Sequence, residues 1–168
     1  VHAETSTGVL SDIKALGAIK GDALLVTDAV TSIVGSELRA DDWGIDVGYA
    51  GTQKCLGVAP GLAPFTISDR AFERLNQKPQ SWYVDLGLLG GYVGEASGGR
   101  TYHHTAPVAM IASLEAALGR VLAEGLENAF QRHRLLAEAV RRAVAAWSEG
   151  QVLGFNIAEA GERSNTVT

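Results

Sequence analysis

Several features are scarce in the 168-residue sequence, and each scarcity excludes a class of protein. With one cysteine, Cys55, the chain cannot form an internal disulfide framework or a multi-cysteine zinc site. No apolar run approaches the roughly 18 residues of a membrane-spanning helix, and no signal-peptide pattern is present. Basic residues number 14 against 19 acidic, which argues against a nucleic-acid or anionic-membrane partner. We therefore expect a soluble, intracellular, cytoplasmic protein.

Glycine, in contrast, is abundant. It accounts for 20 of the 168 residues, whereas about 7% is usual. Glycine at this density, without a collagen period or low complexity, indicates tight turns and close approaches of the backbone. Hydrophobic residues make up 46% of the chain and charged residues 20%, which is typical of a folded globular protein.

Short apolar runs alternate with segments of helical periodicity, a pattern typical of an α/β fold with a mostly parallel sheet flanked by helices. Strands are expected over 23–26, 45–50, 63–67 and 152–155, and helices over 11–20, 68–77, 105–124 and 126–147. Ser11, Ser68 and Thr105 are the expected helix N-caps. The glycine-rich stretch 78–101 is expected to be a long irregular loop.

The clearest helical signal lies over 126–147. Its apolar stripe alternates spacings of four and three: Leu126, Phe130, His133, Ala137, Val140, Val144 and Trp147. His133 lies on this stripe, so we expect it to pack or to make a buried hydrogen bond rather than to act in catalysis. Trp147 is expected in the core.

Two charged residues follow strands of the predicted sheet. Asp28 comes at the carboxyl end of the first strand, where open α/β sheets bind ligands; it is either a local N-cap or the counter-charge of a bound cation. Lys54 follows the strand that ends at Ala50, within the glycine-flanked segment 51–57 (GTQKCLG). We expect Lys54 to have an apolar neighbourhood, in which its amine loses a proton readily, as an imine-forming amine requires. The alternative is a solvated turn lysine.

An aspartate and a lysine at neighbouring strand ends match the needs of pyridoxal phosphate. The lysine holds the cofactor as a Schiff base, and the carboxylate keeps the pyridine nitrogen protonated, which makes the ring an electron sink. Segment 5–8 (TSTG) offers hydroxyls for the phenolic oxygen of the ring. Segment 102–105 (YHHT), at a predicted helix N-terminus, offers a phosphate site.

Four segments in order carry a resemblance to a known family: 2–8 (HAETSTG), 28–32 (DAVTS), 51–56 (GTQKCL) and 102–107 (YHHTAP). They resemble the class V, fold-type I aminotransferases, in particular the alanine–glyoxylate and serine–glyoxylate (or serine–pyruvate) branch. Residues 125–128 (GLEN) and 132–134 (RHR) resemble that branch as well.

The resemblance implies a role for each matching residue. Lys54 would be the Schiff-base lysine and would move the proton between the substrate α-carbon and the cofactor. Asp28 would pair with the pyridine nitrogen, and Val30 would pack against one ring face. The ring oxygen would be contacted by Thr5 or by the adjacent Ser6.

Three further residues complete the implied site. Gln53 would lie near the phosphate or the ring. Tyr102 and Thr105 would reach the phosphate of the neighbouring subunit's cofactor, which implies a homodimer with shared sites. No metal is expected, because His103 and His104 lack a third ligand.

The sequence also departs from the family pattern. The family usually has two glycines where Ile33-Val34-Gly35 stands here, and often two prolines where Val58-Ala59-Pro60-Gly61 stands. The family's upstream phosphate loop, its ring-stacking aromatic residue and its downstream carboxylate-binding arginine have no match. We therefore expect an internal fragment, inactive by itself, in which 1–150 is part of the large cofactor domain and 151–168 begins the small one.

The activity implied is a transfer of the amino group from alanine or serine to glyoxylate or pyruvate. Two alternatives stay open: a lyase or desulfurase of the same fold, and a non-catalytic dimerisation fragment. Cys55 beside Lys54 invites the desulfurase alternative. That branch usually has a histidine before the lysine, where this chain has Gln53, so a packed thiol is expected at Cys55.

Overall fold

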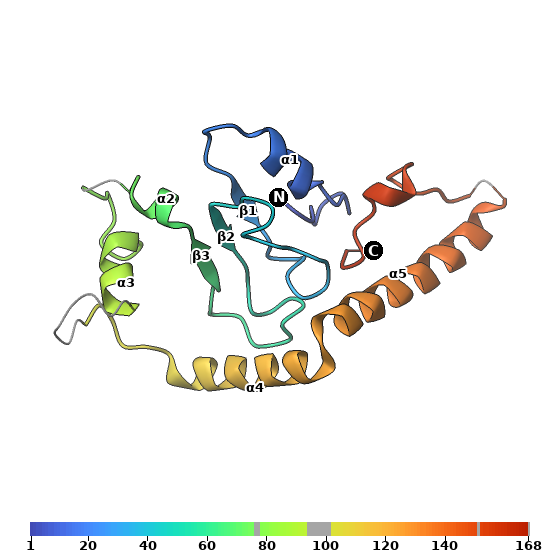
Figure 1. The fold of residues 1–168 in the computed structure, drawn as a ribbon. Coiled ribbons are helices and arrows are strands. Elements are labelled where there is room, and N and C mark those ends of the chain that lie inside the picture. The colour runs from blue at the N-terminus through green and yellow to red at the C-terminus, as the bar shows by residue number, and fades with distance from the viewer. Residues whose placement is uncertain (76–77, 94–101, 151, 168) are drawn as a thin grey trace.

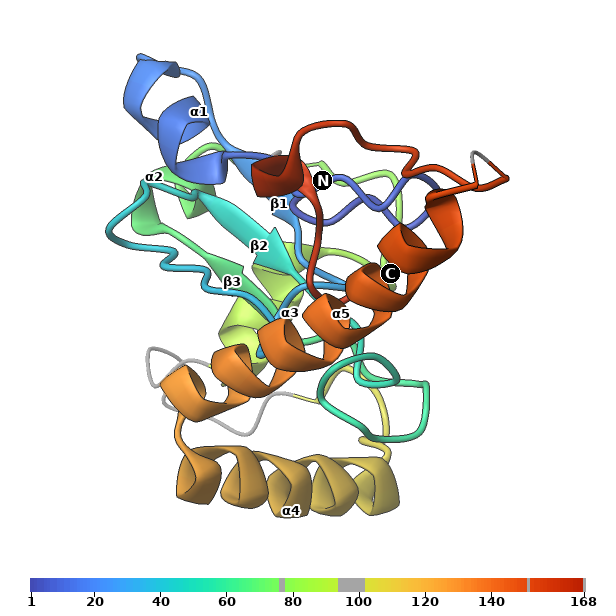
Figure 2. The ribbon, with the colours of Figure 1, turned by 90° about the vertical axis from the view of Figure 1, so that its right-hand side faces the viewer.

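The computed structural model describes residues 1–75, 78–93, 102–150 and 152–167. In chain order the elements are α1 (Ile13–Ile19), β1 (Val26–Asp28), β2 (Val47–Tyr49), β3 (Phe65–Ile67), α2 (Asp69–Phe72), α3 (Leu86–Val93), α4 (Val108–Glu124), α5 (Leu126–Ser148) and the 3₁₀ helix η1 (Ala160–Glu162). The sheet lies at the centre, and α4 and α5 form a bent arm around it (Figures 1 and 2). None of the helices in this described part is long and apolar enough to cross a membrane.

The three strands form one sheet in the order β1-β2-β3. β1 and β2 are parallel, with Asp28 opposite Tyr49, whereas β2 and β3 are antiparallel, with Tyr49 opposite Phe65. The α/β class is therefore confirmed, but a mostly parallel sheet is wrong for the described residues. The reason is the connection: a parallel pair needs a crossover, usually a helix, and here the chain folds straight back, with Ala50 N–H donating to Pro64 O at 2.9 Å.

Two of the three expected N-caps are wrong. The first turn of α1 is capped by Asp12 rather than Ser11, because Asp12 Oδ1 accepts from Ala15 N–H at 2.8 Å. Thr105 caps no helix, since its hydroxyl pairs with Tyr102 Oη at 2.5 Å and α4 begins after Pro107. Ser68 is confirmed, although the helix that it caps, α2, ends at Phe72 instead of continuing to 77.

The expected loop over 78–101 contains a helix, α3. Asp85 Oδ1 accepts from the N–H groups of Gly87 and Leu88 at 2.9 and 3.1 Å and so caps its first turn. A Cβ at Gly90 would lie 2.8 Å from the Phe72 ring, so the glycine permits close packing of α3 on α2. Residues 94–101 lie outside the described residues. The strand expected over 152–155 is wrong, because these residues form an irregular segment before η1.

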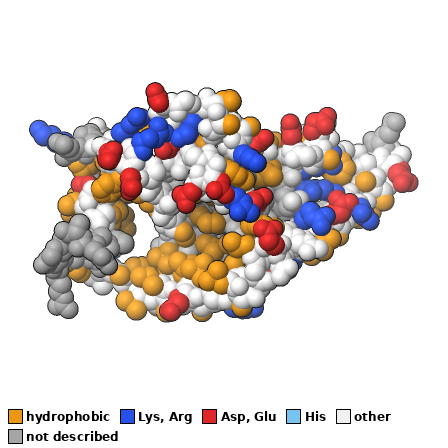
Figure 3. All heavy atoms as spheres, viewed as in Figure 1, with side chains coloured by type: hydrophobic (Ala, Val, Ile, Leu, Met, Phe, Trp, Pro, Cys, Tyr) orange, Lys and Arg blue, Asp and Glu red, His pale blue; other side chains and the backbone are white. Residues whose placement is uncertain are grey.

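The core joins the two long helices to the turns that follow β1 and β2. Val34, Leu56 and Ala129 are buried together, with Leu114 and Val121 of α4 packed against them. His133 on α5 bonds Ala129 O through Nδ1 at 2.8 Å and is half-buried, so the expected hydrogen bond is present but only partly buried. Ala137 of the α5 stripe is buried, whereas Trp147 is 64% exposed, so the core position expected for Trp147 is wrong. Figure 3 shows hydrophobic side chains gathered between the sheet and α4.

One buried carboxylate ties the amino-terminal end of the sheet together. Asp46, just before β2, is 4% exposed. It accepts hydrogen bonds from Leu25 N–H at 2.8 Å, Ser68 Oγ at 3.2 Å, the Arg70 guanidinium at 2.9 and 3.0 Å, and Lys20 Nζ. The hydrogen bond from Arg70 is the largest cause that holds the pKa of Asp46 well below its usual value. The carboxylate therefore links α1, β1, β2 and the start of α2.

We expect Asp46→Asn to lower the free energy of unfolding of the full-length protein by about 2–3 kcal/mol, because it leaves two cations without their buried partner. Urea denaturation at pH 7 measures this. Since the folded state lowers the pKa of Asp46 below 3.8, the contribution is present above that pH and is lost as the pH falls through the folded value. The difference in the free energy of unfolding between the unchanged protein and Asp46→Asn should therefore become smaller at acid pH.

Arg142→Gln is the matched control. It removes the exposed pair between Arg142 and Glu138 on α5 and should cost about 0.5 kcal/mol or less. Equal losses in the two variants would show that Asp46 does not hold the sheet together.

Candidate active site at the carboxyl edge of the sheet

The candidate site lies where the two parallel strands end. β1 ends at Asp28 and β2 ends at Tyr49, and the parallel register places these two residues side by side. The segments that follow them, 29–35 and 51–57, are turns. Carboxyl ends of parallel strands meet at one edge of a sheet, so both turns emerge at this edge.

Both oxygens of the Asp28 carboxylate accept a hydrogen bond. Val30 N–H donates to Oδ1 at 2.9 Å, and Tyr49 Oη donates to Oδ2 at 2.9 Å. The first bond is the local cap considered from the sequence, since it closes the turn after β1. The second comes from the neighbouring strand. This hydrogen bond to Asp28 is also the largest cause that raises the pKa of the Tyr49 phenol, which keeps the phenol a donor.

The turn that carries Lys54 is held in place by buried side chains and by hydrogen bonds of its own residues. Thr52 is fully buried and donates through Oγ1 to Ala59 O at 2.8 Å, and Leu56 is 5% exposed in the core. Gly57 N–H donates to Lys54 O at 2.9 Å. With Thr52 and Leu56 turned inward, Gln53 and Lys54 point outward and are exposed. The apolar neighbourhood expected for Lys54 is therefore wrong in the described residues.

The side chains of Val30 and Gln53 both lie close to the buried backbone of Gly51. A Cβ at Gly51 would lie 2.8 Å from Gln53 Oε1 and 3.5 Å from Val30 Cγ1. Any side chain at Gly51 would therefore displace Gln53. The structure thus brings together Asp28, Val30, Gln53 and the turn of Lys54, all of which the sequence predicts as site residues.

The amino-terminal segment is tied to the same edge by three hydrogen bonds. His2 N–H donates to Asp28 O at 2.8 Å, and Thr31 Oγ1 donates to Ala3 O at 2.7 Å. The His2 Nδ1 atom lies 2.9 Å from Ser32 Oγ. Three of the four family-like segments, 2–8, 28–32 and 51–56, therefore meet in one region.

Thr5 and Ser6 lie in an exposed turn over 5–7. The N–H group of Ser6 donates to Glu4 Oε1 at 2.9 Å. Both residues line a cavity of about 340 Å³, together with Val140 and Arg141 of α5. Their predicted contact with a ring oxygen stays a prediction.

The fourth segment lies apart from this edge. Tyr102 is 73% exposed in the connection between α3 and α4, which runs below α3 in Figure 1. The next residue, His103, is buried: its ring stacks on Trp82 with centroids 4.3 Å apart, and Nε2 lies 3.0 Å from Trp82 O. This fixes the segment and leaves the paired hydroxyls of Tyr102 and Thr105 on the outside.

Cys55 is a packed thiol, as the sequence predicts. Its Sγ donates weakly to Thr31 O at 3.6 Å, and burial raises the pKa of the thiol above its usual value. A raised thiol pKa reduces the fraction of reactive thiolate.

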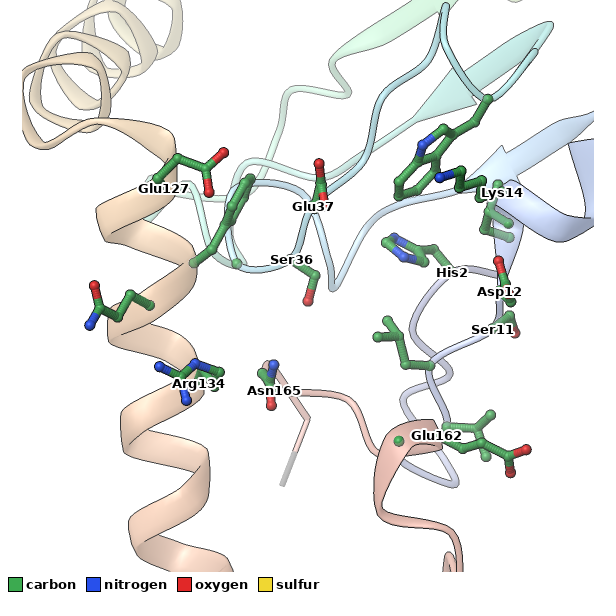
Figure 4. A pocket seen from close by; sticks show the side chains of 18 residues that line it. His2, Ser11, Asp12, Lys14, Ser36, Glu37, Glu127, Arg134, Glu162 and Asn165 are labelled. Atoms are coloured by element: carbon green, nitrogen blue, oxygen red, sulfur yellow. The ribbon is translucent and has the colours of Figure 1, made fainter.

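A larger cavity of about 1090 Å³ lies elsewhere in the molecule (Figure 4). It is bounded by the amino-terminal segment, the loop at Ser36 and Glu37, α5 at Arg134, and the carboxyl-terminal segment at Asn165. Neither Asp28 nor Lys54 lines it. The candidate site at Asp28 and Lys54 is therefore separate from this larger cavity.

Several supporting residues were not predicted from the sequence. Tyr49 and His2 contact the segment of Asp28, Thr31 links that segment to Ala3, and Thr52 holds the turn of Lys54. Tyr49 had a usable signal, because it is the last residue of a strand that runs parallel to the strand of Asp28. The hydrogen bonds of Thr31 and Thr52 connect positions distant in sequence, and no local pattern indicates them.

Comparisons with known proteins identify the family of this chain. The family model described as aminotransferase class-V matches residues 1–168. An L-aspartate–glyoxylate aminotransferase of Paracoccus denitrificans (strain Pd 1222) is 43% identical over 152 residues, which cover 87% of this chain and 37% of that protein. An alanine–glyoxylate aminotransferase of Oryctolagus cuniculus is 38% identical over 146 residues, which cover 84% of this chain and 37% of that protein.

A solved structure is similar as well. The crystal structure of an alanine–glyoxylate aminotransferase from Nostoc sp. has a TM-score of 0.83 at 38% identity, and the match covers 98% of this chain and 43% of that one. The chain therefore spans about two fifths of the length of the relatives that it matches.

The link between His2 and Ser32 generates a pH prediction. Burial lowers the pKa of His2 below its ordinary value of 6.5. Above pH 6.5 the imidazole is neutral in both states; as the pH falls through 6.5 towards the folded pKa, the unfolded chain takes up the proton first. The full-length protein should therefore lose stability over this interval, which urea midpoints between pH 8 and pH 5 measure.

His2→Asn should reduce the dependence of the urea midpoint on pH over this interval, because asparagine does not titrate. His104→Asn serves as the control, since His104 lies outside the tied segments. If the slope of the His2 variant matches that of the unchanged protein, the buried imidazole does not couple the two segments to pH.

Proposed function

Because the chain belongs to the class-V aminotransferase family, we propose that it forms part of a pyridoxal phosphate enzyme that transfers an amino group from a small amino acid to a small 2-oxo acid. Enzymes of this family depend on pyridoxal phosphate. The observation that carries the proposal is the meeting of Asp28 and the turn of Lys54 at one sheet edge. Glyoxylate is in the names of the relatives from Paracoccus and Oryctolagus, so we propose glyoxylate or pyruvate as the acceptor and alanine or serine as the donor.

The residues at the edge fit this cofactor. A flat cationic ring needs an anionic partner, and the Asp28 carboxylate is held in one orientation by two donors while each oxygen keeps an acceptor position. A ring also needs an apolar group against one face, and Val30, which is half-buried two residues after Asp28, can supply it. A covalent hold needs an accessible amine, and Lys54 is exposed on a fastened turn.

Each residue then has a task. Lys54 would hold the cofactor through Nζ and afterwards move a proton at the substrate α-carbon. Asp28 would hold the proton on the ring nitrogen, and Val30 would support one ring face. Gln53 would contact the ring or the phosphate, and Thr5 or Ser6 the ring oxygen. When bound, pyridoxal phosphate supplies an electron sink for negative charge at the substrate α-carbon.

We further propose a homodimer in which Tyr102 and Thr105 reach the partner's cofactor phosphate. Two observations support this. The Tyr102 and Thr105 hydroxyls are exposed and preformed as a pair, away from the edge that holds Asp28. The segment that carries them is fixed by the stack of His103 on Trp82, so the hydroxyls can be presented outward to a second subunit.

The chain is part of a larger catalytic unit in this proposal. It spans about two fifths of its relatives, so the carboxylate-binding arginine and the group that stacks on the ring would come from elsewhere in the protein. Residues 1–150 would belong to the large cofactor-binding domain and 151–168 would begin the small domain. A cytoplasmic location stays a prediction. No observation favours the desulfurase alternative, because the packed Cys55 is unsuited to act as a nucleophile.

Lys54→Ala tests the proposal directly. In the full-length protein we expect transamination between alanine or serine and glyoxylate to fall by about 10²–10⁴-fold, because both the covalent hold and the proton transfer are lost. Borohydride reduction of the unchanged protein, followed by peptide mass spectrometry, should place the cofactor label on Lys54.

Lys14→Ala is the matched control. It removes another exposed lysine, on α1 and away from the edge, and should leave activity and labelling unchanged. A label on a different lysine, or full activity in Lys54→Ala, would refute the assignment. Sulfide release from cysteine by the unchanged protein would favour the desulfurase instead.

A further inference from the structure

Among the described residues, Tyr49 is the one whose side chain reaches from a neighbouring strand to donate a hydrogen bond to the Asp28 carboxylate. It is the last residue of β2 and lies directly opposite Asp28 in the parallel register. Its Oη donates to Asp28 Oδ2 at 2.9 Å. The contact follows from strand pairing, because opposite residues of parallel strands present their side chains on the same face of the sheet.

A packing role does not account for this tyrosine. Its side chain is 38% exposed, and Phe65, which lies opposite it on β3, is 45% exposed. An exposed ring contributes little to a core. Tyrosine differs from phenylalanine only in its hydroxyl, and here that hydroxyl donates its hydrogen bond to Asp28.

The other oxygen of Asp28 is held by its own turn. Val30 N–H donates to Oδ1, so the two donors lie on opposite oxygens and fix the rotation of the carboxylate plane. A carboxylate oxygen accepts two hydrogen bonds. One acceptor position therefore stays open on each oxygen. The carboxylate already has its orientation before a cation binds.

We propose that Tyr49 is a positioning residue, whose phenol holds the Asp28 carboxylate in the orientation that receives the protonated ring nitrogen of the cofactor. This inference rests on the proposed function. In this proposal, Tyr49 contacts neither the cofactor nor the substrate, and it acts only through Asp28. Preorganisation of this kind strengthens binding, because the rotational freedom of the carboxylate is already lost before the cation arrives.

The test is Tyr49→Phe in the full-length apo-protein, with two probes: pyridoxal 5′-phosphate and its 1-deaza analogue, in which carbon replaces the ring nitrogen. Binding is followed by absorbance. We expect the variant to raise the dissociation constant of pyridoxal phosphate about tenfold. The dissociation constant of the analogue, which has no ring nitrogen for Asp28 to receive, should change less than twofold.

Ser113→Ala is the matched control, because it also deletes a hydroxyl that donates one hydrogen bond, from Ser113 Oγ to Ala109 O at 2.9 Å on α4. It should change neither dissociation constant. The thermal midpoint of each apo-protein is recorded in parallel, and we expect Tyr49→Phe to keep the midpoint of the unchanged protein within a few degrees.

The outcomes separate the two levels of the proposal. A selective loss of pyridoxal phosphate supports the role of Tyr49. Equal weakening of both probes, or no weakening of either, overturns that role and leaves the proposed function standing. Failure of the unchanged protein to bind pyridoxal phosphate overturns the proposed function, and the role of Tyr49 with it.

Discussion

The structure depends on Asp46, which fixes the sheet at the end opposite to the candidate site. Its backbone N–H donates to Leu25 O at 2.9 Å and its carbonyl accepts from Ser68 N–H at 2.8 Å, while its side chain holds cations from α1 and α2. These bonds set the register of β1 and β2. Because the register continues along paired strands, Asp28 lies opposite Tyr49, three residues after Leu25 and Asp46 respectively. A buried carboxylate at one end of the sheet thus determines which side chains meet at the other.

The sequence predicted those parts of the molecule that depend on local periodicity. The stripe over 126–147 is a helix, since a spacing of three and four residues permits little else over that length. The pairing of Asp28 with the turn of Lys54 was also predictable, because both follow strands and parallel strands end at one edge. The direction of β3 was not, since residues 51–64 could have formed a crossover and instead fold back.

Competition between neighbouring groups explains most of the other differences. Asp12 and Ser11 are both good caps, and only the local geometry decides which oxygen reaches the free N–H group. Threonine is a residue type that often caps helices, but the Thr105 hydroxyl is hydrogen-bonded to Tyr102 instead. The exposure of Lys54 depends on which way its turn rotates, and the rotation is set by Thr52, whose partners Ala59 and Leu62 lie beyond the turn. Residue type alone does not decide any of these three choices.

The departure from the family at Val34 shows how strongly the loop after Asp28 is constrained. Val34 has a φ of 69°, a left-handed conformation that suits the glycine usual in the family. A β-branched residue there costs about 1–3 kcal/mol, yet the backbone keeps the conformation. Ile33 N–H donates to Ala29 O and Ser36 N–H to Ser32 O, and the Val34 side chain is buried against Leu56 and Ala129.

Burial of the Val34 side chain offsets part of the strain in its backbone, because it adds an apolar group to the core that joins this loop to α4 and α5. The loop could relax only by giving up the bonds from Ile33 to Ala29 and from Ser36 to Ser32, which flank Val34, and Ser32 is also the partner of His2. The conformation is therefore imposed by the tie between segments 2–8 and 28–32. The same tie holds Asp28 and Val30 where the proposed cofactor needs them, so the strain at Val34 is a consequence of keeping the site in place.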